Sequence, residues 1–185
     1  MPNASRNIFT SDGWTLTKLE DSSICESFDC ADSDLNDYFH SDAALYRNEL
    51  LTQTYCLHLS DLPSLVLALL DFCNDAVHIE QYRKVVEIDS RKQHRHLPAV
   101  KLTRFGVHRK FQSKNIGTHA LNMAKRFFIT DNRTGCRLLI VDAYNNPRVL
   151  NFYEKNGFKA LIDTDKDKAK PTRALYFDLK RLVIC

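Results

Sequence analysis

Apolar and polar residues alternate along the first part of the chain, a pattern typical of β-strands. Residues 14–19 and 52–59 alternate in this way, while the apolar run 65–72 is typical of a strand buried on both faces. A hairpin turn is expected just before that run. After a candidate cap at Asp32 or Ser33, apolar positions keep helical spacing and predict a helix. The first half of the sheet should therefore be antiparallel.

Strand and helix patterns take turns in the second part of the chain. The predicted strands are 99–107, 137–143, 157–162 and 174–179, and the predicted helices are 115–128 and 147–156. Residues 74–98 are less regular: a helix is expected over 76–88 and a basic loop over 89–96. We therefore predict a single α/β domain over residues 13–185 after a polar tail at 1–12, with a mixed sheet of about six or seven strands flanked by helices.

Composition fits one domain in a reducing compartment. A chain of 185 residues that is 44% hydrophobic is long enough for one packed core and short for two. The longest apolar run, Leu65–Leu70, falls well short of the ~20 residues of a membrane helix, and the N-terminus does not resemble a signal peptide. Six cysteines without a CxxC pair favour the cytoplasm. A net charge of +3 permits an anionic ligand without requiring one.

The stretch 102–118 holds the clearest candidate for a ligand site. A predicted strand ends near Val107, a polar turn follows, and a helix begins near Asn115. Backbone N–H groups at such a helix start bind anions, and Gly117 would let the backbone approach a bulky diphosphate. Positive charge is added by Arg109, Lys110 and Lys114. Neither GxxxxGK[ST] nor GxGxxG is present, and an ordinary turn with solvated lysines is the alternative.

Gly106 interrupts a predicted strand, where glycine often marks a bulge or a close backbone approach. If this strand splays from the parallel strand 137–143, both expose unpaired peptide groups. An extended ligand with its own amides could insert there like an extra strand, and pantetheine is such a ligand. Its diphosphate would lie at the helix start, which makes CoA a simpler fit than ATP. A glycine kept for core packing is the alternative.

Two segments together resemble the GCN5-related N-acetyltransferase (GNAT) family. Gln112-Ser-Lys-Asn-Ile-Gly117 resembles the family's phosphate motif, Q/R-x-x-G-x-G/A, and residues 146–158 (NPRVLNFYEKNGF) are similar to its N-x-x-A-x-x-F-Y-E-K-x-G-F segment. Asn115 stands in place of the first motif glycine, and Val149 in place of a small alanine that borders the thiol pocket. Because Asn is the next-best residue for unusual backbone angles, we expect binding to survive the first change.

The resemblance implies a GNAT-like sheet with a splayed central parallel pair, and an enzyme that transfers acetyl from acetyl-CoA to a primary amine. It further implies that strand amides contact acetyl-CoA, that the turn cradles the diphosphate, and that Asn146 lies near the pantetheine arm. The implied cofactor-binding residues are Phe105, Gly106, Val107, Gln112, Ser113, Lys114, Asn115, Ile116, Gly117, Thr118 and Asn146.

Tyr153 is the candidate catalytic residue. When an amine attacks a thioester, the leaving thiolate needs a proton, and a nearby hydroxyl can supply it as a general acid. The resemblance places Tyr153 at the thiol end of the cofactor. Spacing alone favours a different interpretation, in which Tyr153 is an aromatic residue packed with Leu150 and Phe152.

Other groups of the reaction are less evident. An oxyanion site needs a strand N–H, such as that of Phe105 or Val107. The strand 99–107 carries no carboxylate base. Asp71 and Asp142 are candidates, although strand-end aspartates are more often caps or turn formers. An acceptor amine of low pKa would be largely neutral near pH 7 and would need no strong base.

No metal site is predicted. His94 and His96, with His78 and Cys73 upstream, match no structural zinc spacing, and a solvated basic loop explains them better. No cysteine lies in a recognisable catalytic setting.

The acceptor is the most open question. The pattern Phe28-Asp-Cys…Leu35…Tyr38-Phe39…Ala43 resembles the opening of the GNAT toxins that acetylate aminoacyl-tRNA, which would bring an antitoxin partner. A backbone-tracking surface is suggested by basic residues at Arg83, Lys84, Arg91, Lys92, Arg95, Arg109, Lys110 and Lys114. The alternatives are a protein or polyamine-type N-acetyltransferase and a non-catalytic CoA- or nucleic-acid-binding module. A homodimer is compatible with each of them.

Overall fold

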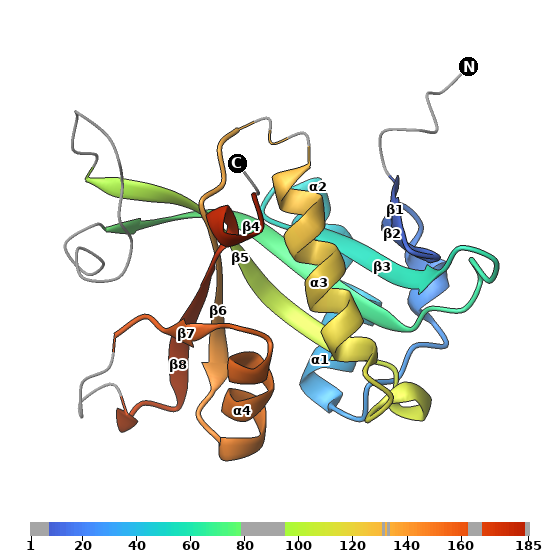
Figure 1. Ribbon diagram of the computed structural model, residues 1–185. Helices are drawn as coiled ribbons and strands as arrows, with labels where there is room; N and C mark the ends of the chain where they lie inside the picture. The colour runs from blue at the N-terminus through green and yellow to red at the C-terminus, as the bar shows by residue number, and fades with distance from the viewer. Residues whose placement is uncertain (1–7, 79–94, 131, 133, 163–167, 184–185) are drawn as a thin grey trace. The chain divides into compact units, whose positions relative to one another are not determined.

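The computed structural model describes residues 8–78, 95–130, 132, 134–162 and 168–183. The chain divides into two compact units. The first unit comprises residues 1–73 and 103–127, and the second comprises 74–102 and 128–185. Each is described by itself below, and Figure 1 labels the elements of both.

The first unit is an antiparallel sheet with helices. Its strands are β1 (Ile8–Ser11), β2 (Trp14–Lys18), β3 (Gln53–Leu59), the start of β4 (Ala68–His78) and the end of β5 (His96–Val107). Its helices are α1 (Ser33–Asp37), a π-helical turn (Tyr38–Asp42), α2 (Ala43–Asn48) and most of α3 (Ile116–Ile129). Pairing is antiparallel from β1 to β4, as the alternating pattern predicted.

Strand β1 was not predicted, because its residues fall in the expected polar tail. Asp12 and Gly13 both adopt left-handed backbone angles, with φ of 54° and 79°, and form the tight turn that joins β1 to β2. Arg126 of α3 forms an ion pair with Asp12 and so ties this turn to the helix. The extra strand raises the sheet to eight strands, above the predicted number.

Helix α1 begins where the cap was predicted. The Asp32 side chain accepts a hydrogen bond from the Leu35 N–H at 3.1 Å. The helix then widens into the π-helical turn, in which the Ala43 N–H bonds the Tyr38 carbonyl. Two consecutive aromatic residues, Tyr38 and Phe39, are both buried there.

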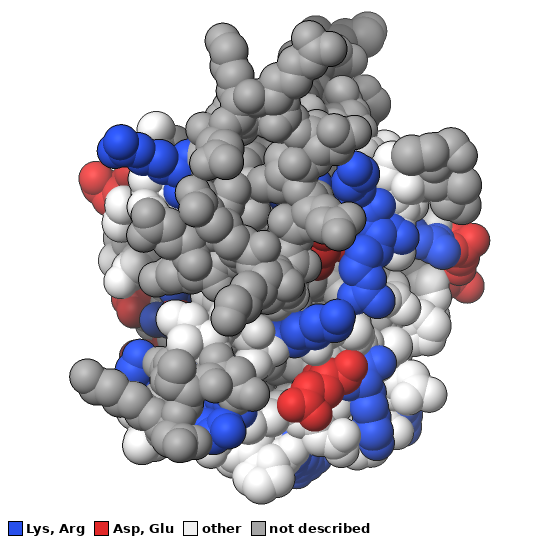
Figure 2. Space-filling model, turned by 60° about the vertical axis from the view of Figure 1, so that its left-hand side comes forward, with Lys and Arg blue, Asp and Glu red and all other residues white. Residues whose placement is uncertain are grey.

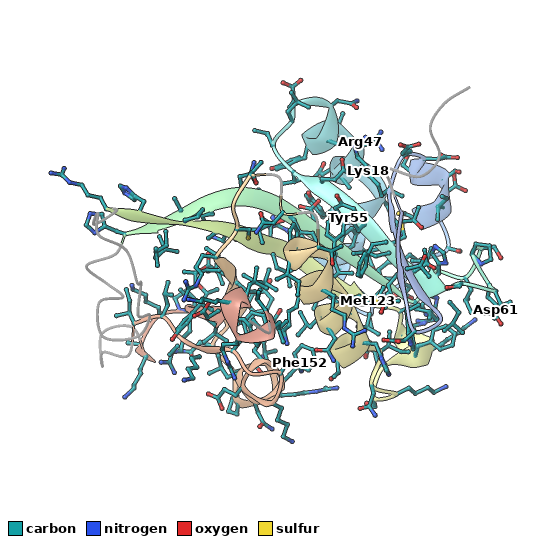
Figure 3. The ribbon with its side chains drawn as sticks, turned by 45° about the horizontal axis from the view of Figure 1, so that its top comes forward. Lys18, Arg47, Tyr55, Asp61, Met123 and Phe152 are labelled. Atoms are coloured by element: carbon teal, nitrogen blue, oxygen red, sulfur yellow. The ribbon has the colours of Figure 1, made fainter. Side chains whose placement is uncertain are left out.

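One part of the interior of the first unit lies between the sheet and α3, and another packs the aromatic residues Phe28 and Phe39 with Leu69 of β4. Phe127 of α3 packs on Phe9 and Tyr55, with ring centroids 5.8 and 5.1 Å apart. Figure 3 labels Tyr55 of β3 and the buried Met123 of α3. Four of the α3 positions that helical spacing indicated are buried, namely Ile116, Ala120, Leu121 and Ala124. Phe127 and Phe128, on the same predicted face, are only half-buried.

The second unit contains the parallel pair. Its elements are the rest of β4 and β5, then β6 (Leu138–Tyr144), α4 (Pro147–Lys155), β7 (Lys159–Ala160) and β8 (Thr172–Asp178). β5 and β6 run parallel, whereas β6 with β8 and β7 with β8 run antiparallel. By hydrogen-bonded neighbours the strand order is β1-β2-β3-β4-β5-β6-β8-β7, which confirms a mixed α/β sheet.

Two predictions for the irregular region need correction. Residues 76–78 continue β4 as strand rather than starting a helix, because Val77 packs into an apolar cluster with Leu97 and Ile140. His96 begins β5 rather than ending a loop. The remainder of the predicted helix and loop, 79–94, lies outside the described residues. In the part of the chain that is described, no helix is long and apolar enough to cross a membrane.

Candidate functional site

The turn that follows β5 has an unusual backbone. After Val107 a 3-10 turn covers Arg109–Phe111, Gln112 is extended, and α3 begins at Ile116. Between them, Ser113 and Asn115 have positive φ angles of 62° and 61°, rare for residues other than glycine. We call residues 107–118 the diphosphate turn.

The left-handed angle at Asn115 occurs at the position where the family motif has its first glycine. Alternating left- and right-handed residues orient successive N–H groups toward one side, an arrangement that binds anions. This turn also leads into the N-terminus of α3, a helix of 14 residues. Residues 112–118 include no carboxylate, and Lys114 lies 5.5 Å from the centre of the Phe111 ring. The residues present therefore fit a diphosphate.

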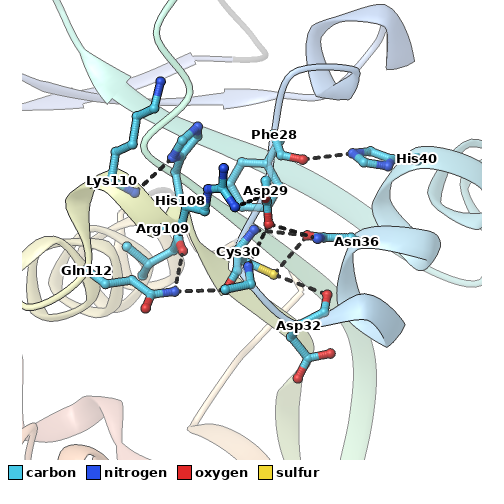
Figure 4. A network of polar contacts seen from close by, with 12 residues as sticks. Phe28, Asp29, Cys30, Asp32, Asn36, His40, His108, Arg109, Lys110 and Gln112 are labelled. Atoms are coloured by element: carbon cyan, nitrogen blue, oxygen red, sulfur yellow. Dashed lines mark hydrogen bonds and ion pairs between the residues drawn. The ribbon is translucent and has the colours of Figure 1, made fainter.

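The Gln112 side chain is directed into the protein rather than toward solvent. Its amide nitrogen donates hydrogen bonds to the backbone carbonyls of Cys30, at 2.8 Å, and Val107, at 3.1 Å (Figure 4). The first motif residue thus ties the turn to a distant segment of the first unit.

Asp29 makes a second tie to this segment. Its carboxylate lies 3.0 Å from the Arg109 guanidinium, and its backbone carbonyl accepts the Arg109 N–H at 2.8 Å. The same carboxylate accepts hydrogen bonds from the Ala31 N–H and the Asn36 amide. These hydrogen bonds, the one from Ala31 first, and the Arg109 charge hold the pKa of Asp29 below its usual value. Arg109 is therefore an ion-paired residue and not a free cation.

Gly106 lies in the strand that leads to the turn, and packing explains its small size. A Cβ atom there would lie 3.2 Å from Cys30 Cβ and 3.3 Å from a ring carbon of Phe28. Its neighbours Phe105 and Val107 are half-buried. The parallel register of β5 with β6 ends at Leu102↔Val141, before these residues, while β5 continues to Val107 and β6 to Tyr144. Their predicted contacts with acetyl-CoA stay a prediction.

Tyr153 lies on α4 in the second unit. Its ring packs edge-on against Phe152 and Phe158, with centroids 5.2 and 5.3 Å apart, and only 6% of the residue is exposed. Burial raises its pKa above the ordinary value of 10.0, so the hydroxyl keeps its proton near neutrality. Over the described ranges, no group forms a hydrogen bond with that hydroxyl.

Helix α4 is set by local contacts. Asn146 is its N-cap, accepting the Val149 N–H at 2.9 Å, and Pro147 follows at the first helical position. This cap uses the side-chain oxygen of Asn146, and the residue is exposed. Gly157 ends the helix with φ of 81°, and the Phe158 N–H returns to the Tyr153 carbonyl.

Neither candidate base is arranged as an open carboxylate. Asp71 is fully buried in the middle of β4, not a cap, and accepts hydrogen bonds from the hydroxyls of Tyr38, Thr54 and Thr103 at 2.9, 2.6 and 2.5 Å. Asp142 of the second unit forms an ion pair with Lys101 at 2.5 Å. An incoming ammonium would have to displace these partners.

Several site features were not found from the sequence. Asp29, Cys30 and Asn36 contact the diphosphate turn or brace the segment that does. The toxin-like opening pattern includes Asp29 and Cys30, but nothing in the sequence indicated that these three residues would support the turn. The left-handed angle at Ser113 was also missed, since no glycine signals it. Of the histidine group, His94 lies outside the described residues, and the described part of the chain has no cluster of three or more metal-ligating residues.

Known proteins resemble this chain both in fold and in the segment that carries the two motifs. A family model described as an acetyltransferase (GNAT) domain matches residues 69–160, which include the diphosphate turn and α4. A search of curated protein sequences finds no match.

Solved structures resemble the chain over nearly its whole length. A crystal structure of a bacterial toxin shares 17% identity with a TM-score of 0.71, covering 90% of this chain and 92% of that chain. AtaT complexed with acetyl-methionyl-tRNAfMet shares 20% identity with a TM-score of 0.66, covering 91% and 96%. AtaTR bound with AcCoA shares 21% identity with a TM-score of 0.64, covering 93% and 97%. At these identities the likeness is one of fold. The family match shows a GNAT acetyltransferase domain over residues 69–160, and this family uses acetyl-CoA for N-acetyl transfer.

Proposed function

We propose that this enzyme transfers acetyl from acetyl-CoA to the α-amine of an aminoacyl-tRNA. The diphosphate turn carries the acetyl-CoA part of the proposal. It combines two residues with left-handed backbone angles, the N-terminus of a long helix and a sequence, 112–118, without carboxylates. The backbone N–H groups of 112–118 would hold the diphosphate, with the strand amides of Phe105 and Val107 and the region of Asn146 contacting the pantetheine arm.

Tyr153 would act as the general acid. The amine nitrogen bonds to the acetyl carbon, the carbon–sulfur bond breaks, and the departing sulfur takes a proton from the Tyr153 hydroxyl. The raised pKa of Tyr153 keeps its hydroxyl protonated near neutrality, as a proton donor must be. After it has attacked as a neutral amine, the acceptor nitrogen loses a proton to solvent, and Tyr153 regains a proton from solvent before the next turnover.

The tRNA acceptor is supported by comparison and by charge. AtaT was solved with an acetylated aminoacyl-tRNA, and its mutant with the C-terminus of the antitoxin AtaR. In the described part of this chain, Arg95, Lys110 and Lys114 are exposed basic residues. Figure 2 shows Lys and Arg side chains at the surface, with acidic side chains among them. The predicted basic residues at 83, 84, 91 and 92 lie outside the described residues. An antitoxin partner and a cytoplasmic location belong to the same proposal.

Incubation with labelled acetyl-CoA tests the proposal directly. The acceptors are charged tRNA, the same tRNA uncharged, spermidine and a peptide. We expect label on charged tRNA alone, recovered as N-acetyl-aminoacyl product after hydrolysis of the ester. If tRNA binds through phosphates, each neutralised contact should steepen the log–log salt dependence by roughly 0.7–0.9.

Each other outcome has a definite meaning. Label on spermidine or the peptide, with none on tRNA, would keep the enzyme and remove the tRNA acceptor. Tight CoA binding without transfer to any acceptor would favour a non-catalytic module. An Arg95→Gln variant should flatten the salt dependence, whereas Lys159→Gln, a matched loss of one exposed charge on β7, serves as the control.

A further inference from the structure

We propose that residues 28–36 set the shape of the diphosphate turn, with Asn36 and Asp29 as positioning residues for acetyl-CoA. The inference rests on the acetyl-CoA part of the proposed function. These residues precede the matched domain, which begins at residue 69, and none belongs to either motif. We call residues 28–36 the bracing segment.

Three kinds of contact join the bracing segment to the diphosphate turn. The Gln112 amide donates to the Cys30 carbonyl at 2.8 Å. The Arg109 N–H donates to the Asp29 carbonyl at 2.8 Å, and the two side chains form an ion pair at 3.0 Å. Cys30 and Phe28 also fill the space beside Gly106. Because the three contacts act on consecutive positions, they fix the path of the chain from Gly106, just before the turn, to Gln112 within it.

The bracing segment is itself held by one side chain. Asn36 donates from its amide nitrogen to the Asp29 carboxylate at 3.0 Å. Its amide oxygen accepts the Cys30 N–H at 2.9 Å and the Cys30 thiol at 3.1 Å. Asp29 in turn accepts the N–H of Ala31, a residue at φ of 63°. Both amide atoms of Asn36 are therefore used to hold the two residues that touch the turn (Figure 4).

The turn needs such support from outside. Ser113 and Asn115 hold left-handed angles that side chains other than glycine disfavour, and such angles persist where the surroundings over-determine them. Cys30 is 6% exposed, so its hydrogen bonds are shielded from water. The Asp29–Arg109 pair is 37% and 61% exposed and contributes less. Asn36 and Gln112 should accordingly matter more than the ion pair.

Calorimetry with CoA measures the effect on affinity. Asn36→Leu keeps the branched shape without polar atoms, and Gln112→Met keeps the length; each should weaken CoA binding about tenfold, the effect of one lost shielded hydrogen bond. Asp29→Asn, which removes the ion pair alone, should weaken it about two- to threefold. Asn48→Leu and Asp37→Asn make the same exchanges at exposed sites of α2 and α1, outside the bracing segment, and should bind as the wild type does.

Phosphorus NMR separates positioning from general destabilisation. At saturating CoA, the diphosphate resonances of Asn36→Leu should move toward those of free CoA, while the 3′-phosphate resonance stays where the wild type has it. Weaker binding with unchanged diphosphate resonances would mean a merely structural role and would overturn the inference. So would wild-type affinity in both Asn36→Leu and Gln112→Met. Failure of the wild type to bind CoA would instead refute the proposed function, so the two failures are distinguishable.

Discussion

The diphosphate turn and helix α4 carry the two halves of the proposed chemistry, and they are stabilised in opposite ways. The turn is shaped by side-chain hydrogen bonds from residues far away in the sequence, such as Cys30 to Gln112. Helix α4 begins at the cap residue Asn146, which bonds the N–H of Val149 only three residues away. Tyr153 is buried there among rings that are also close in sequence. A short motif can therefore specify α4 nearly alone, while the turn depends on what lies outside its motif.

The two regions also differ in what a substitution should change. The Tyr153 hydroxyl forms no hydrogen bond with the rest of the described chain, so removal of this oxygen should leave the fold intact and affect the reaction step. In the turn, the proposed function assigns binding to the backbone, so substitutions there should affect affinity.

Tyr153→Phe should give the largest effect. General acids contribute about 10²- to 10⁴-fold, so kcat should fall by that factor while CoA affinity by calorimetry stays unchanged. Tyr55→Phe is the matched control, because Tyr55 also packs among aromatic rings, in the first unit. Nearly full turnover in Tyr153→Phe would assign the residue to packing, or the proton to water.

Gly117→Asp should have the next largest effect, on the turn. A carboxylate placed at the start of α3 opposes the diphosphate, and such like-charge contacts cost several kcal/mol, so CoA affinity should fall about 100-fold or more. Asn122→Asp adds the same charge on the exposed side of α3 and should change affinity little. Unchanged calorimetry for Gly117→Asp would disprove the assignment of the turn.

Asn146→Ala should have the smallest effect and tests the local character of α4. Loss of a helix cap costs about 1 kcal/mol, so the free energy of unfolding in denaturant should fall by that amount without ligand. Asn151→Ala, at an exposed position inside α4, replaces a weaker helix former and should not lower stability. Equal losses for both variants would mean that the Asn146 side chain does not act as a cap.

The hydrophobic pattern was sufficient for several elements. Helix α3 and strands β3 and β6 lie within two residues of their predicted bounds. The apolar spacing of α3 and β3 is regular, and β6 carries a continuous apolar run that is buried on both faces. β1 escaped prediction because four residues with mixed polarity carry little periodic signal, and the strand is defined by the turn at Asp12 and Gly13.

The sequence identified the motif residues of the candidate site, but not the residues outside the motifs that hold them in place. Gln112 was identified as a motif residue, but its partner is a backbone carbonyl, which no residue type can signal. Asn36 was invisible for a related reason: an Asn inside a helical pattern is ordinary, and its importance comes from two residues brought beside it by the fold. Long-range polar contacts of this kind can be found only from the three-dimensional structure.

The link between Gln112 and Cys30 spans 82 residues, and this separation has a consequence for folding. Closing so long a loop is entropically costly, so contacts of this kind tend to form late, after local helices and hairpins. Newly made chains would thus acquire the final shape of the diphosphate turn late in folding. A fragment trimmed to residues 69–160 would retain both GNAT motifs, at 112–117 and 146–158, and would still lack Asp29, Cys30 and Asn36. The acetyltransferase is therefore not modular at the boundaries that its family motif suggests.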